Sequence, residues 1–436
     1  MKSKWLLLFV AFINISVYAQ QQKPLSIKQA VETALTNSDE AKLADTKVTT
    51  AENELQTTKN LQYPDLEISG QYQHLFQPDI DLQVATGESS SSEDGFVSPD
   101  VTYLMLGQAS LSVPIFSGFK IQNSIDASEN IFQSTKFDAL SDKERVALQT
   151  IIYYVNLYKA QQTVELFKEN LKSAQQRVKD FSAMEENGLL ARNDLLKAKL
   201  QESNIQLSLE ESQKNVRMLN YKLATFLKQP TEVYYTISEN NFGISEQNIH
   251  NTSDSNRPEL ASLQYKKEAS ENNIKIAESN YYPSLALVGG YVAADLDNIF
   301  TINQAVNVGV GLSYDLTGIF KNKSEVRVAK SKSQEIEHSL DILQDKIKIE
   351  IENAQQDYQL ALRKFEVYSQ SVEQAEENYR IVKDKYDNGL EDTNDLLEAD
   401  VQQLQAKINL TYAKAEITLK KYQLYKAEGN LINQFN

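Results

Sequence analysis

The sequence predicts a mainly α-helical protein with a smaller β part that enters a membrane, built from two similar halves. Long segments carry apolar residues at steps of three or four, and four short segments alternate apolar and polar residues. Only 14 Gly and 8 Pro occur in 436 residues, which suits long uninterrupted helices. The stretch NGLLARNDLLKAK at 187–199 returns as NGLEDTNDLLEAD at 388–400, which indicates an internal duplication.

The composition excludes several classes of function. The chain has no Cys, which rules out disulfides, thiolate metal sites, a Cys nucleophile and a lipid anchor on an N-terminal Cys. The net charge of −16 argues against nucleic acid as a partner, because a nucleic-acid groove needs a basic surface. The sequence has no phosphate-binding loop, and His74, His250 and His338 are widely separated. We therefore expect no enzyme, no catalytic residue, no cofactor and no metal, and we expect any driving energy to come from a partner.

Residues 1–19 are typical of a secretory signal peptide. Lys2 and Lys4 precede the apolar run Trp5–Ile13, and the sequence VYA at 17–19 is a small-x-small cleavage site. The apolar run is shorter than the roughly 20 residues that a spanning helix needs. No later segment is long and apolar enough to be such a helix. The mature chain is therefore expected to be exported, and to enter a membrane only as strands.

The first repeat is expected to span residues 20–228. Its first helical pattern begins at Leu25 and stops at Tyr63-Pro64, because the residue before Pro avoids the helical region. Alternating segments at about 65–74 and 101–114 follow, with PIFSG ending the second, and the loop between them holds the Ser-rich acidic run Glu88–Asp94. The remaining elements are a long helix over 121–187, a turn at Gly188 and a returning helix over 193–228.

The second repeat, 257–436, is expected to follow the same order. A polar equatorial linker at 229–256, with one short β-like run at 233–237, separates it from the first. Its elements are a helix from Arg257 to Tyr282-Pro283, strands at about 284–293 and 306–316 around a loop at 294–305, a long helix to about Tyr386, a turn at Gly389 and a helix to the C-terminus.

The second long helix carries a narrow apolar stripe with every step three or four residues. So narrow a stripe on so long a helix cannot build a globular core, and it needs neighbouring helices along its length, as in coiled coils. The stripe consists of Ile336, Leu340, Leu343, Ile347, Ile351, Ala354, Tyr358, Ala361, Phe365, Tyr368, Val372, Ala375, Tyr379, Val382 and Tyr386.

Four strands present a closure problem in a membrane. In hydrocarbon every backbone amide and carbonyl must be paired, so a spanning sheet must close on itself. The smallest single-chain outer-membrane barrels have about eight strands. The chain is therefore expected to associate, with two copies giving eight strands and three giving twelve. An interior of about eight strands is largely filled by side chains, so an open conduit favours three or more copies.

The order and duplication of these elements resemble one known family. The phrases that carry the resemblance are YPDLEISGQY at 63–72, PIFSG at 114–118, RPELASLQ at 257–264, YYPSLALVGGY at 281–291 and the two NGL…NDLL turns. Together they resemble the TolC family of outer-membrane efflux proteins over essentially the whole mature chain.

The resemblance implies a TolC-like fold in the outer membrane of a Gram-negative bacterium. Three copies would form a homotrimer with one twelve-stranded β-barrel in outer-membrane lipid and an α-helical tunnel through the periplasm. The implied partners are a periplasmic membrane-fusion adaptor and an inner-membrane pump of the resistance-nodulation-division or ATP-binding-cassette type.

The second turn is the candidate aperture. Asp395 and Glu398 are three residues apart on one helix face, and aligned by the Gly they match two acidic positions of the family's periplasmic constriction. In a trimer they would form two rings of carboxylates that attract cations. The alternative is a capping box with Asp395 as N-cap and Glu398 three residues on. The first turn has Asp194 but Lys197 at the matching positions.

Tyr386 and the hairpin tips complete the candidate site. Tyr386 matches a family tyrosine of the closed-state network, and it is also the last residue of the apolar stripe. Gly suits the left-handed conformation that closes a helix, and Asn-Asp suits the N-cap of the next one. The tips at 185–195 and 387–396 are expected to contact the adaptor, through Gly188, Leu189, Asn193, Asp194, Gly389, Leu390 and Asn394.

Two functions fit this architecture, and two other classes compete with it. The first function is an outer-membrane channel of a tripartite efflux system, a passive exit duct for drugs and other toxic small molecules. The alternative is the exit duct of a type I protein or peptide secretion system. A periplasmic adaptor with one coiled-coil hairpin would lack the paired amphipathic strands, and a fibrous coiled coil would not need the Tyr-Pro strand units.

Overall fold

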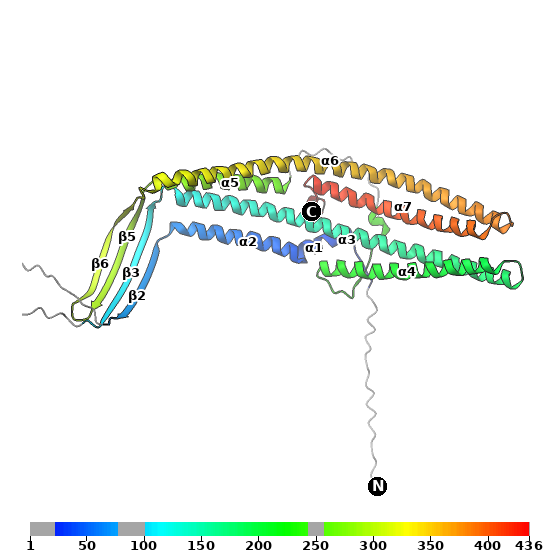
Figure 1. Ribbon diagram of the computed structural model, residues 1–436, viewed down its shortest axis with the longest axis horizontal. Coiled ribbons are helices and arrows are strands. Elements are labelled where there is room, and N and C mark those ends of the chain that lie inside the picture. The colour runs from blue at the N-terminus through cyan, green and yellow to red at the C-terminus, as the bar shows by residue number, and fades with distance from the viewer. Residues whose placement is uncertain (1–21, 77–100, 243–256, 436) are drawn as a thin grey trace, which may run out of the picture. The chain divides into compact units, whose positions relative to one another are not determined.

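The computed structural model describes residues 22–76, 101–242 and 257–435 (Figure 1). The expected signal peptide, the acidic run Glu88–Asp94 and His250 lie outside these ranges. Within them, His74 and His338 are exposed.

The described elements follow one another in the order helix, strand pair and helical hairpin, given twice. The first half contains β1 (Gln22–Pro24), α1 (Ile27–Asn37), α2 (Asp39–Lys59), η1 (Asn60–Gln62), β2 (Asp65–His74), β3 (Tyr103–Phe116), α3 (Lys120–Glu186), α4 (Arg192–Phe226), β4 (Tyr234–Thr236) and η2 (Glu239–Phe242). The second half contains α5 (Pro258–Ser279), β5 (Ser284–Leu296), β6 (Phe300–Ser313), α6 (Gly318–Asp387), α7 (Thr393–Ala427) and η4 (Ile432–Gln434).

The fold has two compact units, and each takes segments from both halves of the chain. One comprises Met1–Thr46, Asp138–Pro258 and Leu343–Asn436, and the other Lys47–Phe137 and Glu259–Ile342. The first holds the core described below and both hairpin tips, and the second holds the four long strands. None of the helices in the described ranges combines membrane-spanning length with membrane-like hydropathy.

The four long strands form one antiparallel sheet in the order β2-β3-β5-β6 (Figure 1). The pairing register places residues of similar polarity opposite one another across the four strands. One row joins the apolar Leu66, Leu111 and Val308 through Gly289. Another, on the opposite face, consists of Glu67, Ser110, Gly290 and Asn307. The sheet therefore has one apolar face and one polar face, as the period of two predicts.

The strands are longer than the sequence predicted at two places. The predicted loop at 294–305 is wrong in extent, because β5 continues to Leu296 and β6 starts at Phe300. The turn is only three residues long, and Asn298 takes a positive φ of 59° within it. Polar partners hold its flanks, since Thr301 Oγ1 donates to Asp295 Oδ1 at 2.7 Å. β3 also runs past Pro114, where the pairing register shifts.

The first predicted helix is divided in two at Ser38. This residue has an extended backbone, with φ −63° and ψ 148°, and its side chain accepts from Ala41 N at 3.2 Å. Ser38 therefore caps the start of α2 as it ends α1. Apolar residues keep their helical spacing across Ser38, so the periodicity of the sequence did not reveal the division.

Aromatic side chains fill the centre of the first unit. Tyr158 stacks on Phe242 with ring centroids 3.9 Å apart, and Tyr154 Oη donates to Leu25 O at 2.8 Å. Burial raises the pKa of Tyr158 to about 12. Asn220 on α4 fastens the strand β4, since its Nδ2 donates to Val233 O at 2.7 Å and its Oδ1 accepts from Tyr235 N at 2.9 Å. These bonds place the small parallel sheet β1-β4 over the helices.

The apolar stripe on α6 faces other helices along its whole length. Every residue from Ile336 to Tyr386 that the heptad spacing selected is buried or half-buried, and Ile347 is fully buried. The neighbouring faces of α6 are exposed. The structure therefore confirms that this long helix is packed by a narrow seam, as in a coiled coil.

Candidate functional site at the hairpin tips

Both hairpin turns end their first helix in the same way. Gly188 and Gly389 each have φ 73°, the left-handed conformation that Gly adopts without a Cβ penalty. Leu189 N donates to Met184 O at 2.8 Å, and Leu390 N donates to Lys385 O at 2.9 Å. These bonds, from the third residue past each helix back over five positions, define a Schellman motif.

The leucine after each glycine points into solvent. Leu189 is 75% exposed and Leu390 is 74% exposed. In a Schellman motif the residue at this position commonly packs back on the helix. Each tip instead presents a large apolar side chain beside polar residues.

The helices that follow the turns start earlier than the sequence predicted. Asp392 is the N-cap of α7, and its Oδ1 accepts from Asn394 N at 2.7 Å and from Asp395 N at 3.1 Å. The capping box with Asp395 as N-cap is therefore wrong. Asn394 and Asp395 lie inside the first turn of the helix, as the equivalent Asn193 and Asp194 do in α4.

The two turns differ at the cap itself. Ala191 occupies the position equivalent to Asp392, and no side chain caps α4 there. The carboxylates also differ, since Lys197 Nζ donates to Asp194 Oδ1 at 3.3 Å in the first turn. The position of Lys197 is taken by Glu398 in the second. Only the second turn therefore carries two exposed acids on one face.

Asp395 shares a hydrogen bond with Glu391, and the two acids shift in opposite directions. That hydrogen bond, with the nearby charge of Asp392, raises the pKa of Asp395. Lys385 donates to Glu391 Oε1 at 2.8 Å, and this bond lowers the pKa of Glu391. Asp395 is therefore the member of the pair that takes up a proton first as pH falls. Glu398 lies outside this pair and accepts from Gln402 Nε2 at 3.0 Å.

Tyr386 links the two hairpins. It is half-buried, and its ring stacks on Phe181 of α3 with centroids 5.7 Å apart. Burial raises the pKa of its hydroxyl, and a hydrogen bond to Thr393 opposes the rise. Phe181, Leu195, Ala198 and Leu396 form the small apolar cluster on which it rests. Tyr386 therefore ends the apolar stripe and also joins α6 to the first hairpin.

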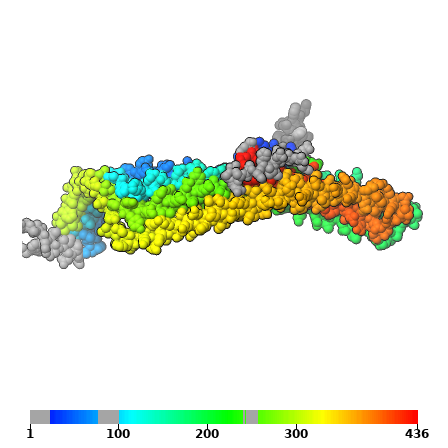
Figure 2. Space-filling view, turned by 90° about the horizontal axis from the view of Figure 1, so that it is seen from above, coloured from blue at the N-terminus to red at the C-terminus, as the bar shows by residue number. Residues whose placement is uncertain are grey.

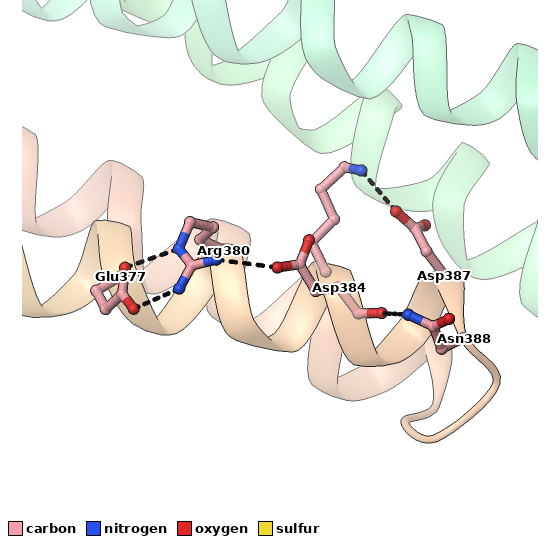
Figure 3. A network of polar contacts seen from close by, with 6 residues as sticks. Glu377, Arg380, Asp384, Asp387 and Asn388 are labelled. Carbon is pink, nitrogen blue, oxygen red and sulfur yellow. Dashed lines mark hydrogen bonds and ion pairs between the residues drawn. The ribbon is translucent and has the colours of Figure 1, made fainter.

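The solvent face of α6 near its tip carries a ladder of charged residues (Figure 3). Arg380 donates to both carboxylate oxygens of Glu377, at 2.8 and 2.7 Å, and to Asp384 Oδ2 at 3.0 Å. Asn388 Nδ2 then donates to Asp384 O at 2.7 Å. The members are spaced three or four residues apart, so the ladder stabilises the end of the helix from its own side chains.

A buried ion pair two to three turns from each tip was not predicted from the sequence. Arg177 Nη1 donates to Asp400 Oδ2 at 3.0 Å, and the side chains are only 9% and 4% exposed. Burial opposes the charge of Arg177, but the bond to Asp400 raises its pKa overall. One signal was present, because Ala174, Arg177 and Phe181 are three and four apart, so Arg177 stands at an apolar position.

Comparison with known proteins gives a consistent result. The family model described as outer membrane efflux protein matches residues 69–226 and 250–430. The outer membrane efflux protein BepC of Brucella suis biovar 1 (strain 1330) is 20% identical over 329 residues, covering 74% of this chain and 71% of BepC.

Solved channels share the fold. The outer membrane protein VceC of Vibrio cholerae matches with a TM-score of 0.73 at 17% identity, covering 92% of this chain and 96% of that one. The CmeC outer membrane channel of Campylobacter jejuni matches with a TM-score of 0.77 at 19% identity, covering 93% and 86%. These likenesses confirm the predicted fold class.

Proposed function

Because the chain belongs to the outer membrane efflux protein family, we propose that it is the exit duct of a tripartite efflux system for drugs and other toxic small molecules. Membership makes it an outer-membrane channel that reaches into the periplasm, and not an enzyme. In the proposal a periplasmic membrane-fusion adaptor and an inner-membrane pump open the duct and supply the energy. The efflux wording in the names of the family and of BepC supports small molecules as cargo.

The observation that carries the assembly is a sheet that is apolar on one face and open at both edges. β2 and β6 each pair with a single neighbour, so each has one edge without a partner strand among the described residues. Large apolar side chains are exposed on both, including Ile68 at 79% and Val308 at 78%. In lipid such edges must pair. Three copies would join β2 to β6 of the next copy and close a twelve-stranded barrel.

Exposed apolar stripes on two helices support contact between copies. Figure 2 shows that the part of α6 toward its tip is uncovered on the face in view. From Val328 onward its large exposed apolar residues recur at spacings of seven, eleven or fourteen, which keeps them on one side of the helix. This stripe consists of Val328, Ile342, Ile349, Leu360, Val367 and Ile381, and α4 carries another made of Leu196, Leu200, Leu207, Met218 and Tyr221.

The stripes lie on different helices, so a contact between them would be head-to-tail. Head-to-tail contacts close into rings such as a trimer, whereas a two-fold dimer buries the same patch on both copies. The homotrimer proposed here therefore agrees with both the sheet edges and the helix surfaces. The domain organisation belongs to the same proposal: a signal peptide at 1–19, repeats at 20–228 and 257–436, and an equatorial linker at 229–256.

Asp395, Glu398 and Tyr386 form the aperture in this proposal. Both acids are exposed on the single chain, and neither contacts a basic side chain at hydrogen-bond distance among the described residues. In a ring of three copies the carboxylates would face one another, repel anions and attract cations. Tyr386, stacked on Phe181, would hold the second hairpin against the first in the closed state.

The exposed leucines support the tips as the adaptor contact. Leu189 and Leu390 are the most exposed large apolar side chains at the two turns, and residues of the same turns, Asn193, Asn394 and both glycines, are exposed beside them. Exposed apolar side chains rimmed by polar ones are typical of interaction surfaces.

The test begins with the purified protein. We expect a trimer mass in detergent and single channels in planar bilayers, and a folded monomer without a pore would contradict the proposal. Deletion of the gene should raise sensitivity to toxic dyes and drugs, with restoration by the intact gene. Unchanged sensitivity together with loss of a secreted protein or peptide would instead assign the chain to type I secretion.

A further inference from the structure

Side chains from all four helices of the two hairpins join in one polar network around a buried carboxylate. Asp400 on α7 accepts from Arg177 on α3 at 3.0 Å and from Gln201 on α4 at 3.4 Å. Asn170 on α3 donates to its other oxygen at 3.3 Å, and Arg177 also donates to Tyr379 Oη on α6 at 3.3 Å. Asp400, its three partners and Tyr379 are called the hub below.

The hub lies at the same depth in both hairpins. Arg177 precedes Gly188 by 11 residues, and Asp400 follows Gly389 by 11 residues. At about 1.5 Å per residue, roughly 14 Å of α3 and roughly 10 Å of α7 lie between the hub and the turns, because α3 ends at Glu186 and α7 starts at Thr393. The hub therefore divides each hairpin into a short tip segment and a long shaft.

The tip side of the hub is loosely filled. An open cavity of 1010 Å³ runs from the hub to the turns, lined from both hairpins by residues that include Asp180, Met184, Lys383 and Asp387, and on α3 its lining continues past Arg177 to Lys172. On this side the hairpins meet through the half-buried stack of Phe181 on Tyr386, with the apolar cluster around it. The two hairpins can therefore separate in this segment with the loss of little more than apolar contacts.

The shaft side is held by polar bonds that run from α3 to α7. Lys159 Nζ pairs with Glu416 Oε2 at 2.7 Å, and Thr163 Oγ1 lies 3.2 Å from Tyr412 Oη. The hub itself is harder to break than either, because it is buried and separation would leave a charge without a partner inside the protein.

We propose that the hub is the fulcrum of tip opening: the two hairpins separate on the tip side of Asp400, while the shaft stays packed. The proposal rests on the function proposed above, since it assumes that the tips open. It assigns Arg177 and Asp400 as positioning residues that limit how far the opening travels.

The absence of Cys in the chain makes this directly testable with introduced pairs. One pair, D180C/K383C, bridges the hairpins on the tip side, and the other, K159C/E416C, bridges them on the shaft side. Each is cross-linked in the trimer with a short bis-methanethiosulfonate reagent that reductant removes. Single-channel conductance is recorded before cross-linking, after it and after reduction, with the four single-Cys variants treated in parallel.

We expect the tip-side cross-link to lower conductance at least twofold and reduction to restore it. The shaft-side cross-link, formed to the same extent by mass spectrometry, should leave conductance unchanged. An effect of both cross-links, or of neither, would overturn the fulcrum. A preparation that forms no channel before cross-linking contradicts the proposed function instead, so the two failures are distinguishable.

A second background tests the hub itself. The substitutions R177M and D400L remove both charges together and replace them with apolar side chains, which avoids an unpaired buried charge. Without the hub the opening should extend into the shaft, so the K159C/E416C cross-link should now lower conductance. If it still has no effect in this background, the hub does not limit the opening.

Discussion

Arg177 and Asp400 face each other at 3.0 Å across the two hairpins, almost completely buried, although they are 223 residues apart in the sequence. Removal of one of two buried opposite charges destabilises a protein strongly, whereas replacement of both by apolar side chains is often close to neutral. Substitution of one partner and substitution of both partners should therefore change the stability of the protein differently.

The substitution Asp400→Leu alone should destabilise the folded chain, because the guanidinium of Arg177 would remain buried without a carboxylate. Loss of one partner of a buried pair costs about 3–5 kcal/mol. R177M/D400L should recover most of this loss. Thermal unfolding of the detergent-solubilised protein, followed by circular dichroism, checks both. A double variant as unstable as the single one would show that the hub contributes packing that apolar side chains cannot replace.

The acidic pair of the second turn should control ion flow. The variant D395A/E398A should raise single-channel conductance or lower cation selectivity in planar bilayers, because it removes fixed negative charge at the proposed aperture. The duplication supplies the matched control, D194A/K197A, which changes the equivalent positions of the first turn. If the two variants have equal effects, or if neither has an effect, Asp395 and Glu398 contribute only to the structure of the turn.

The selectivity should also depend on pH in a particular direction. The hydrogen bond that protonated Asp395 donates to Glu391 raises the pKa of Asp395, so Asp395 should lose its charge, as pH falls, earlier than an ordinary aspartate. Glu391, whose pKa is lowered by Lys385, should stay charged to lower pH than an ordinary glutamate. Cation selectivity should therefore begin to decline on acidification with the loss of charge at Asp395.

The variant E391Q tests this contribution of Asp395. It removes the carboxylate whose hydrogen bond and charge raise the pKa of Asp395, so that pKa should fall. Reversal potentials measured across a salt gradient at decreasing pH should then show selectivity persisting further into acid than in the parent. A shift toward neutral pH would contradict the assigned direction.

The same linkage applies to folding. Folding raises the pKa of Asp395. Such an acid contributes stability at pH values below its pKa in the unfolded chain, and this stability is lost as pH rises through its pKa in the folded protein. Folding lowers the pKa of Glu391. Such an acid contributes stability at pH values above its pKa in the unfolded chain, and this stability is lost as pH falls through its pKa in the folded protein. The two contributions oppose each other, so selectivity is a sharper readout than stability.

Much of the fold could be predicted because the signals are local and repeated. The stripe from Ile336 to Tyr386 fixed which side of α6 is packed, and the alternation around Leu66 fixed the apolar face of the sheet. Gly188 and Gly389 marked both turns, since only a left-handed residue closes a helix in this way. These features depend on neighbours within a few residues.

The features that escaped prediction depend on distant residues or on competition between equally suitable ones. Asp400 is an ordinary polar residue in the sequence, and only the packing of α3 against α7 makes it a buried acceptor. The start of α7 offered Asp392 and Asp395, both good caps, and the sequence did not say which would be chosen. The roles of Asp395, Glu398, Tyr386 and the tip residues stay predictions.

The helices that follow the two turns differ in their N-cap residues, and this difference allows a further test on the same protein. Asp392 caps α7, whereas Ala191 leaves the equivalent start of α4 uncapped. Replacing Asp by Ala at an N-cap costs about 0.5–2 kcal/mol, and the reverse change should recover a similar amount. We therefore expect D392A to speed amide hydrogen exchange of Asn394 and Asp395, whose amides bond to Asp392. A191D should slow exchange at Asn193 and Asp194. If A191D has no effect while D392A does, the first turn cannot adopt the capped geometry, and the two hairpins differ in backbone and not only in side chain.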